Sequence, residues 1–176
     1  MRIIAGKYRG RVLKEFKGRE IRPTADRAKE AIFNILQTEI YGSAFLDLFC
    51  GTGNMGIEAL SRGAERVVMV DSSKESVAIA KFNVDMIKES AQVILTDALT
   101  FVSSTRDKFD IIFLDPPYDI DGAPVLEAIA ENKLLNEGGV VIYEHFEDFK
   151  MGEVKGFTLK STRKYGIAHF EFFVEE

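Results

Sequence analysis

The sequence contains few of the side chains from which disulfides and metal sites are built. One cysteine, Cys50, and two histidines, His145 and His169, occur among 176 residues. A single cysteine excludes an internal disulfide, and this set offers no histidine and cysteine cluster with the spacing of zinc ligands. The sequence therefore predicts no metal site, and any catalysis must depend on other groups.

Long hydrophobic runs are also missing. The N-terminus has no apolar segment ahead of a small-residue cleavage site, and no apolar run reaches the length that spans a bilayer. With 176 residues and 46% hydrophobic side chains, the chain has the size and core-forming content of one domain. We expect a soluble, cytoplasmic, single-domain protein over residues 1–176, with no membrane partner.

Charge is distributed unevenly along the chain. The net charge is −5, but residues 1–30 contain ten Lys and Arg against four Asp and Glu, so the remainder is strongly acidic. This asymmetry is typical of a basic arm that faces a polyanion, and a solvated charged face gives the same pattern. Charge alone leaves both interpretations open.

Hydrophobic periodicity indicates the order of the elements. Residues 1–14 mix apolar residues with Gly6 and Gly10, which predicts a short basic β-hairpin, and a helix with Thr24 as N-cap follows Pro23. From residue 44, five short apolar runs alternate with helical segments; these include helices from about 73 to 89, 99 to 103 and 123 to 131. Such runs are typical of buried parallel strands, and two alternating strands around Gly166 complete the chain. The sequence predicts an α/β fold: a doubly wound, mostly parallel sheet of seven strands with an antiparallel C-terminal hairpin at its edge.

The ends of the expected strands carry polar groups. Asp47, Asp71, Asp97 and Asp115 lie at or near the ends of the first four apolar runs, and residues 50–56, CGTGNMG, match a nucleotide-binding glycine loop. Ligands of open α/β sheets bind at the carboxyl ends of the strands. Asp71 is placed to accept from ribose hydroxyls, and Asp97 from an adenine amine unless it only caps a helix. Gly51 and Gly53 allow close approach of a ligand to the backbone, and NAD and S-adenosylmethionine are both consistent with this loop.

Asp47 and the segment Asp115-Pro116-Pro117-Tyr118 favour S-adenosylmethionine. The Asp47 charge opposes a pyrophosphate and suits an ammonium group. Asp115 and the Pro116 carbonyl provide acceptors for both hydrogens of a planar amino group, and Tyr118 provides a face on which a flipped base can stack. Cys50 beside this loop is interpreted as a small, partly buried hydrophobe rather than a nucleophile.

The sequence resembles the bacterial 16S ribosomal RNA guanine-N2 methyltransferase family (RsmD) over nearly its whole length. The segments RIIAGKYRGR and RPTADRAKEAIFN are similar to that family's N-terminal signature, LDLFCGTGNMGIEALSRGA to its cofactor loop, and FLDPPY to its catalytic motif. The resemblance implies a Rossmann-like class I methyltransferase with S-adenosylmethionine as cofactor. Its partner would be 16S rRNA, in a partly or fully assembled small ribosomal subunit, and we expect a monomer.

The resemblance also implies a role for particular residues. The catalytic residues would be Asp115, Pro116, Pro117 and Tyr118. The cofactor-binding residues would be Asp47, Phe49, Gly51, Thr52, Gly53, Asp71, Ser72, Asp97, Ala98 and, from the N-terminal side, Thr24. RNA would be bound by Lys7, Arg9, Arg11, Arg22 and Arg27, within a hairpin and helix over residues 1–40 that precede a catalytic core over 41–176.

Three other functions are consistent with parts of the sequence. The DPPY segment fits methylation of adenine N6 or of a protein glutamine amide equally well. The glycine loop alone fits an NAD-dependent oxidoreductase. A non-enzymatic RNA-binding module would fit the basic N-terminus, but it leaves the aspartates at the strand ends unexplained.

Overall fold

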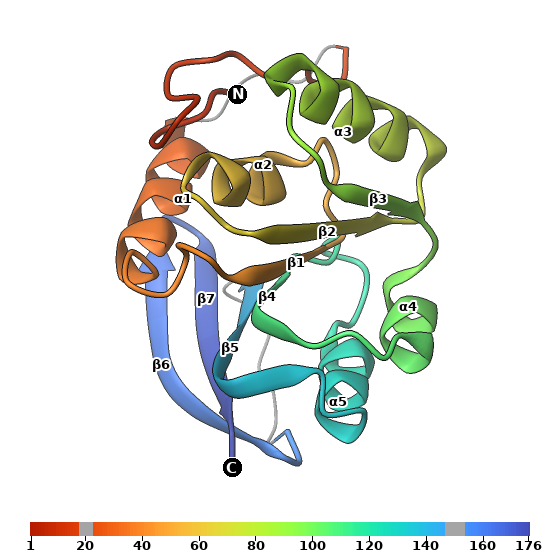
Figure 1. Cartoon of the computed structure of the whole chain (residues 1–176). Coiled ribbons are helices and arrows are strands. Elements are labelled where there is room, and N and C mark those ends of the chain that lie inside the picture. Colours follow the sequence, from red (N-terminus) through yellow and green to blue (C-terminus); the bar gives the residue numbers. More distant parts are fainter. Residues whose placement is uncertain (18–22, 147–153) are drawn as a thin grey trace.

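The protein forms an α/β fold around one mixed sheet (Figure 1). The computed structural model describes residues 1–17, 23–146 and 154–176. Within them, the sheet has seven strands in the order β3-β2-β1-β4-β5-β7-β6. The strands are β1 (Ala44–Leu48), β2 (Arg66–Asp71), β3 (Gln92–Leu95), β4 (Phe109–Leu114), β5 (Leu135–Phe146), β6 (Phe157–Tyr165) and β7 (Ala168–Glu175).

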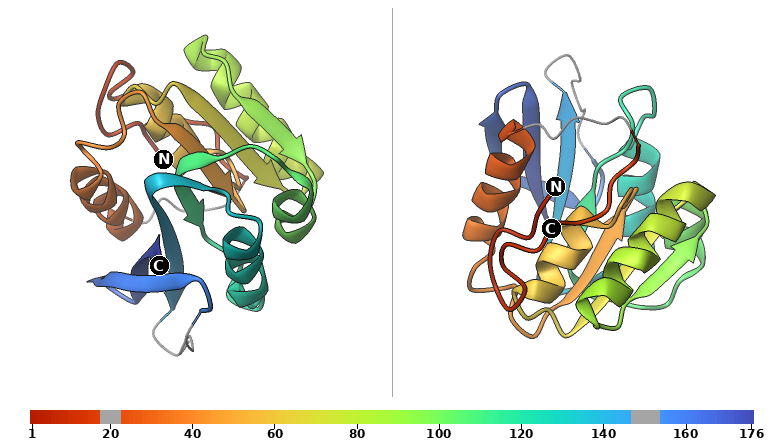
Figure 2. Two further views of the ribbon diagram at one scale, coloured as in Figure 1. Left: turned by 60° about the horizontal axis from the view of Figure 1, so that its bottom comes forward. Right: turned by 90° about the horizontal axis from the view of Figure 1, so that it is seen from above.

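Helices cover both faces of the sheet (Figures 1 and 2). One face carries α1 (Pro23–Ile35), α2 (Asn54–Ser61) and α3 (Lys74–Ile87), and the other carries α4 (Ala98–Ser104) and α5 (Ala123–Glu131). The two helical layers therefore enclose the central strands of the sheet.

Among the residues that the structure describes, none of the helices has the length and apolar character of a membrane span.

Alternate residues of each central strand pack on opposite faces. In β4, Ile111 and Phe113 join the core under α1–α3, whereas Ile112 and Leu114 join the core beside α4 and α5. Both sets are buried, which explains why the central strands read as continuous apolar runs. The sequence interpretation of buried parallel strands is confirmed.

The predicted architecture agrees with the structure in most respects. Strands β1 to β5 are mutually parallel, and β6 and β7 form the expected antiparallel hairpin, with β7 paired to β5. One local prediction is wrong: α1 begins at Pro23, so Thr24 lies in its first turn and is not the N-cap. A proline suits this position because its fixed φ is helical and its missing N–H would have no helical partner.

The N-terminal segment is a loop tied back on itself rather than a regular two-stranded ribbon. Its strand-like part is a single bridge between Arg2 and Val12, extended by hydrogen bonds from Ile3 N to Arg11 O and from Leu13 N to Met1 O. Ile3, Tyr8 and Leu13 are buried in the same core as α1–α3. The segment is thus packed against the domain while its basic side chains remain outside.

Candidate active site

A cavity of ≈ 710 Å³ opens at the carboxyl ends of the central strands. The chain runs outward from β1 to β2 and β3, then returns to β4 on the other side of β1, so the strand order reverses between β1 and β4. Ligands of doubly wound sheets bind at this reversal. The walls come from the ends of β1, β2, β4 and β5 and from the N-terminal segment.

The glycine loop connects β1 to α2 along one wall of this cavity. Phe49, Gly51 and Gly53 all have positive φ, at 59°, 54° and 85°. A Cβ on Gly51 would meet no atom within 4 Å, so its backbone borders open space. Gly56 has a different role, because a Cβ there would lie 2.7 Å from the Met69 side chain. The last glycine therefore allows α2 to pack closely on β2, whereas Gly51 leaves room for a ligand.

Asp47 lies at the base of the loop with its side chain buried. Its Oδ2 accepts a 2.8 Å hydrogen bond from the Gly56 N–H. Burial raises the pKa of Asp47 to about 8, and the charges of Asp115 and Asp71 add to the effect. A cation bound in the cavity would restore the charged form of this carboxyl.

Asp71 ends β2 with a fixed orientation. Its Oδ2 accepts from the Gly51 N–H at 2.9 Å and its Oδ1 from the Ser73 N–H at 2.8 Å. Both Asp71 and Ser72 line the cavity, and so do Phe49, Gly51 and Thr52. These predicted cofactor residues are therefore brought together around one space.

Other predicted cofactor residues lie elsewhere. Gly53, Asp97 and Ala98 do not line the cavity. Asp97 is exposed at the N-cap of α4, where its Oδ1 accepts from the Thr100 N–H at 2.9 Å. Hydrogen bonds from Thr100 hold the pKa of Asp97 below its usual range. Arg22 lies outside the described residues, as does the side chain of Thr24.

The segment Asp115 to Tyr118 follows β4 and forms another part of the cavity wall. All four of its residues line the cavity, and the Tyr118 side chain is 88% exposed, so one ring face is open to a ligand. Asp115 faces the cavity, yet the protein atoms crowded around its carboxyl desolvate it and raise its pKa to about 7. A second hollow of ≈ 530 Å³ adjoins the same segment and is bordered by Pro116, Pro117 and Tyr118.

Sequence reasoning missed several residues of the cavity. Glu144 and Phe146 come from the end of β5, and Met1, Glu15 and Phe16 come from the N-terminal segment. Glu144 could have been found, because it follows the fifth apolar run as the aspartates follow the first four. The N-terminal residues carry no comparable signal, since their position depends on how the segment folds back over the loop.

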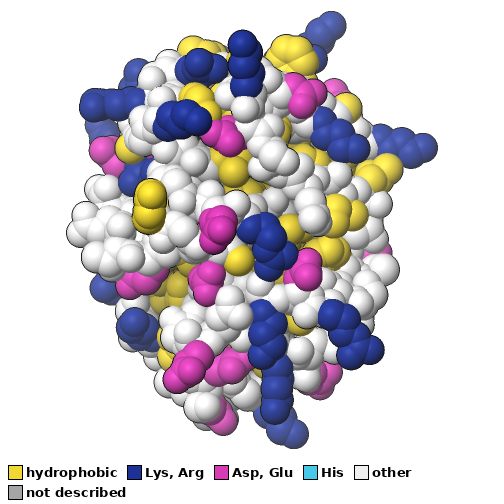
Figure 3. Space-filling model, in the orientation of Figure 1, with side chains coloured by type: hydrophobic (Ala, Val, Ile, Leu, Met, Phe, Trp, Pro, Cys, Tyr) yellow, Lys and Arg dark blue, Asp and Glu magenta, His cyan; other side chains and the backbone are white. Residues whose placement is uncertain are grey.

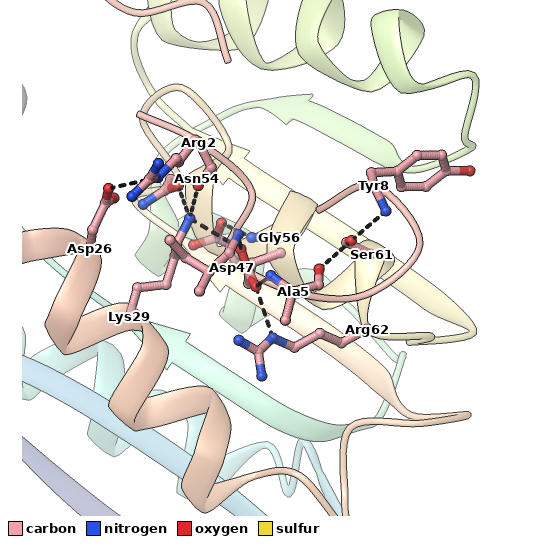
Figure 4. Close-up of polar contacts among 12 residues, drawn as sticks. Arg2, Ala5, Tyr8, Asp26, Lys29, Asp47, Asn54, Gly56, Ser61 and Arg62 are labelled. Atoms are coloured by element: carbon pink, nitrogen blue, oxygen red, sulfur yellow. Dashed lines mark hydrogen bonds and ion pairs between the residues drawn. The ribbon is translucent and has the colours of Figure 1, made fainter. Parts of the chain in front are cut away.

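The sequence analysis also did not predict a buried cluster of ion pairs (Figure 4). The Lys29 Nζ lies 3.2 Å from Glu58 Oε2 and donates to Asn54 Oδ1 at 2.7 Å and to the Arg2 carbonyl. Glu58 also accepts from Arg62 Nε at 2.8 Å and from the backbone N–H groups of Ile4 and Ala5. This cluster attaches the N-terminal segment to α1 and α2 beside the glycine loop, and its Lys29 and Asn54 also line the cavity.

The four predicted RNA-binding residues that the structure describes lie on the surface. Lys7, Arg9, Arg11 and Arg27 are exposed, and Lys7 forms a 3.0 Å ion pair with Glu89. Arg11 donates to the Met86 carbonyl and lies over the Tyr8 ring. Basic side chains on the face shown in Figure 3 are interspersed with acids. The N-terminal charges thus add to a mixed surface rather than forming a uniform patch.

Cys50 is buried beside the glycine loop. Desolvation, together with Asp47 and Asp71, raises the pKa of its thiol, which disfavours the thiolate that a nucleophile requires. In the described residues, no group of three His, Cys, Asp or Glu side chains could hold a metal ion.

The sheet order, the glycine loop and the DPPY segment at the strand ends define a class I methyltransferase fold. The chain belongs to the family described as Conserved hypothetical protein 95, whose model matches residues 1–174. It is 34% identical to a Haemophilus influenzae protein named Ribosomal RNA small subunit methyltransferase D, over 98% of this chain and 93% of that one. A protein of the same name from Escherichia coli K12 is 34% identical over 67% of this chain and 60% of its own length.

Solved structures show the same fold. A chain from Escherichia coli matches with a TM-score of 0.89 and 27% identity, covering 100% of this chain and 98% of that chain. The Thermus protein TTHA0928 matches with a TM-score of 0.83 and 29% identity, covering 100% of this chain and 99% of that chain. The predicted resemblance and the predicted fold are both confirmed.

Proposed function

We propose that the chain uses S-adenosylmethionine to methylate the exocyclic N2 amine of one guanine in small-subunit 16S rRNA. One observation carries the proposal: the acids around the glycine loop and the Asp115–Tyr118 segment line the same cavity. The names of the curated relatives support the rRNA substrate. The guanine and its N2 atom follow from the family resemblance of the N-terminal signature together with the DPPY segment.

The residues of the cavity fit this cofactor better than a dinucleotide. Asp47 is a buried acid at the base of the loop, where a pyrophosphate would be repelled and the ammonium of a methionine group would be stabilised. Asp71 is held in place to accept from ribose hydroxyls. Asp97, which follows β3 and caps α4 outside the cavity lining, is proposed for the adenine amine from its place in the sequence alone. When bound, the sulfonium supplies an electrophilic methyl group and needs no metal to activate it.

The Asp115–Tyr118 segment would hold the amine that accepts the methyl group. Asp115 and the Pro116 carbonyl would accept the two hydrogens of the amine, and Tyr118 would stack on the flipped base. This hydrogen bonding directs the nitrogen lone pair toward the methyl group, so positioning and preorganised acceptors would supply most of the rate. Asp115, with a pKa of about 7, can take the proton that the amine loses.

Two measurements test the proposal. Mass spectrometry of rRNA from a strain lacking the protein should show one guanine that has lost an N2 methyl group. Small subunits from that strain should accept labelled methyl from S-adenosylmethionine when the wild-type protein is added, and the Asp115→Ala, Tyr118→Ala double variant should lose about a hundredfold or more in rate. Wild-type rates in the double variant would refute the assigned site.

The N-terminal basic residues are proposed to hold RNA phosphates. Arg9→Glu with Arg11→Glu should weaken binding to small subunits and flatten its dependence on salt, since phosphate contacts release counterions. The NAD-dependent alternative predicts that NAD raises the melting temperature. We expect S-adenosylhomocysteine, and not NAD, to do so.

A further inference from the structure

Glu144 lies where two spaces meet at the end of β5. Leu114 of β4 pairs with Tyr143 of β5, so the next residues, Asp115 and Glu144, lie side by side at the carboxyl edge of the sheet. Glu144 borders both the ≈ 710 Å³ cavity and the ≈ 530 Å³ hollow beside the Asp115–Tyr118 segment. It therefore faces the space next to the proposed methyl acceptor.

The Glu144 carboxyl oxygens can accept hydrogen bonds, but no donor from the described residues is bound to them. Within the described part of the chain, no hydrogen bond or ion pair of this carboxyl is found, and its neighbour at the edge of the sheet is another acid, Asp115. Burial and the Asp115 charge raise the pKa of Glu144. An acid in such surroundings gains most from a ligand that offers N–H groups.

The hollow around Glu144 suits a flat ring. Its walls include Pro116, Pro117, Ile120, Phe146 and Ile167, and the Tyr118 ring forms one side. These side chains are apolar or aromatic, whereas Glu144 supplies a carboxylate at the boundary with the cavity. A planar heterocycle with adjacent N–H donors on one edge would satisfy both features.

We infer that Glu144 selects guanine by accepting the ring N1–H next to the amine that Asp115 and Pro116 hold. This inference rests on the proposed function and deepens it. Guanine presents N1–H and the N2 amine side by side, whereas adenine and cytosine present a ring acceptor next to their amines. The N1–H donor favours the ionised form of Glu144, and the ionised carboxylate attracts guanine and repels the other two bases; a glutamine amide has no ring to fill the hollow.

The test uses a base that keeps the amine and lacks the ring donor. Mass spectrometry first locates the methylated guanine. Small subunits are then reconstituted with 16S rRNA, ligated so that this position carries either guanine or 2-aminopurine, whose N1 is an acceptor. The wild type should methylate guanine with a kcat/KM about tenfold or more above that for 2-aminopurine.

Glu144→Gln should abolish the preference, because its amide can donate to N1 of 2-aminopurine and can also accept from N1–H of guanine. We expect the guanine to 2-aminopurine ratio of kcat/KM to fall by about tenfold or more, with the melting temperature unchanged. Glu144→Ala should lower the ratio without improving 2-aminopurine. Glu137→Gln, an exposed acid at the other end of β5, is the matched control and should keep the wild-type ratio.

The outcomes separate the two proposals. A ratio in Glu144→Gln within about twofold of wild type, with guanine still methylated, would overturn the role of Glu144 and leave the proposed function intact. Failure of the wild type to methylate any guanine would refute the proposed function, and this inference with it.

Discussion

Two groups of charged side chains lie beside the glycine loop, and they are satisfied in different ways. In the first group, the buried Glu58 accepts hydrogen bonds from Arg62, Ile4 and Ala5 and lies 3.2 Å from the Lys29 ammonium. In the second group, the buried Asp47 accepts one backbone hydrogen bond, and Asp115 and Glu144 lie side by side at the cavity without a basic partner in the described residues.

This difference distinguishes charges that hold the fold from charges that await a ligand. A buried ion stabilises a protein only when partners offset its desolvation, as they do around Glu58. Asp47, Asp115 and Glu144 lack such partners, and their pKa values are raised by desolvation. Their free-energy cost would be offset by the cationic cofactor and the amine that we propose for this cavity.

The largest change in the free energy of unfolding is expected when the ion-pair cluster around Glu58 is broken. Glu58→Ala should lower the free energy of unfolding by about 3–5 kcal/mol, because it leaves the buried Lys29 ammonium without its carboxylate and two backbone N–H groups without an acceptor. Urea unfolding measures the change, and the exposed Glu65→Ala is the control. A loss below about 1 kcal/mol would show that the cluster contributes little.

At Asp47, removing the charge is expected to raise the free energy of unfolding instead of lowering it. Its pKa is raised from 3.8 to about 8, so the folded state retains a proton that the unfolded state has lost across this range. Wild-type stability should therefore decrease as pH rises from about 4 to 8 and then level off. Asp47→Asn, which keeps an acceptor for the Gly56 N–H, should be more stable than the wild type at pH 8, by up to a few kcal/mol, and the difference should vanish near pH 4.

The same variant should lose cofactor affinity, because the amide carries no charge for the ammonium group. Calorimetric titration with S-adenosylhomocysteine at pH 8 measures this loss, and we expect it to be about tenfold or more. An Asp47→Asn protein that is no more stable than the wild type at pH 8 would contradict the interpretation of this acid as a functional rather than a structural charge.

A smaller effect is expected where the N-terminal segment meets α2. Gly6 and Gly10 both have positive φ, near 85°, but a Cβ on Gly6 would lie 1.8 Å from the Ser61 carbonyl oxygen, and one on Gly10 would meet nothing within 4 Å. Gly10→Ala should cost about 1 kcal/mol from backbone strain, and Gly6→Ala about 2–3 kcal/mol because the segment must also shift. Equal unfolding free energies for the two variants would exclude the close contact.

The sequence predicted the features of the fold and the site that depend on short-range residue patterns. Continuous apolar runs indicated the parallel strands, and the rule that ligands bind at strand ends indicated Asp47, Asp71 and the Asp115–Tyr118 segment, all of which line the cavity. The Lys29–Glu58–Arg62 cluster was not predictable, because its members come from two helices whose contact depends on tertiary packing. Charged residues on amphipathic helices are normally solvated, so nothing in the pattern marks these as buried.

The smallest change in stability is expected at Asp97, and its variants would show whether this carboxylate stabilises the fold, binds the cofactor, or does both. Its Oδ1 caps α4 through the Thr100 N–H, a structural role, but the sequence assigns it to the adenine amine, a functional one. Asp97→Ala should lose about 1 kcal/mol of stability, and Asp97→Ser should recover it, because serine is also a good N-cap. If the carboxylate also binds adenine, the serine variant should still bind S-adenosylhomocysteine about fivefold more weakly than the wild type. Wild-type affinity in Asp97→Ser would make this residue a cap alone, and the adenine would then depend on backbone groups of the loop that follows β3.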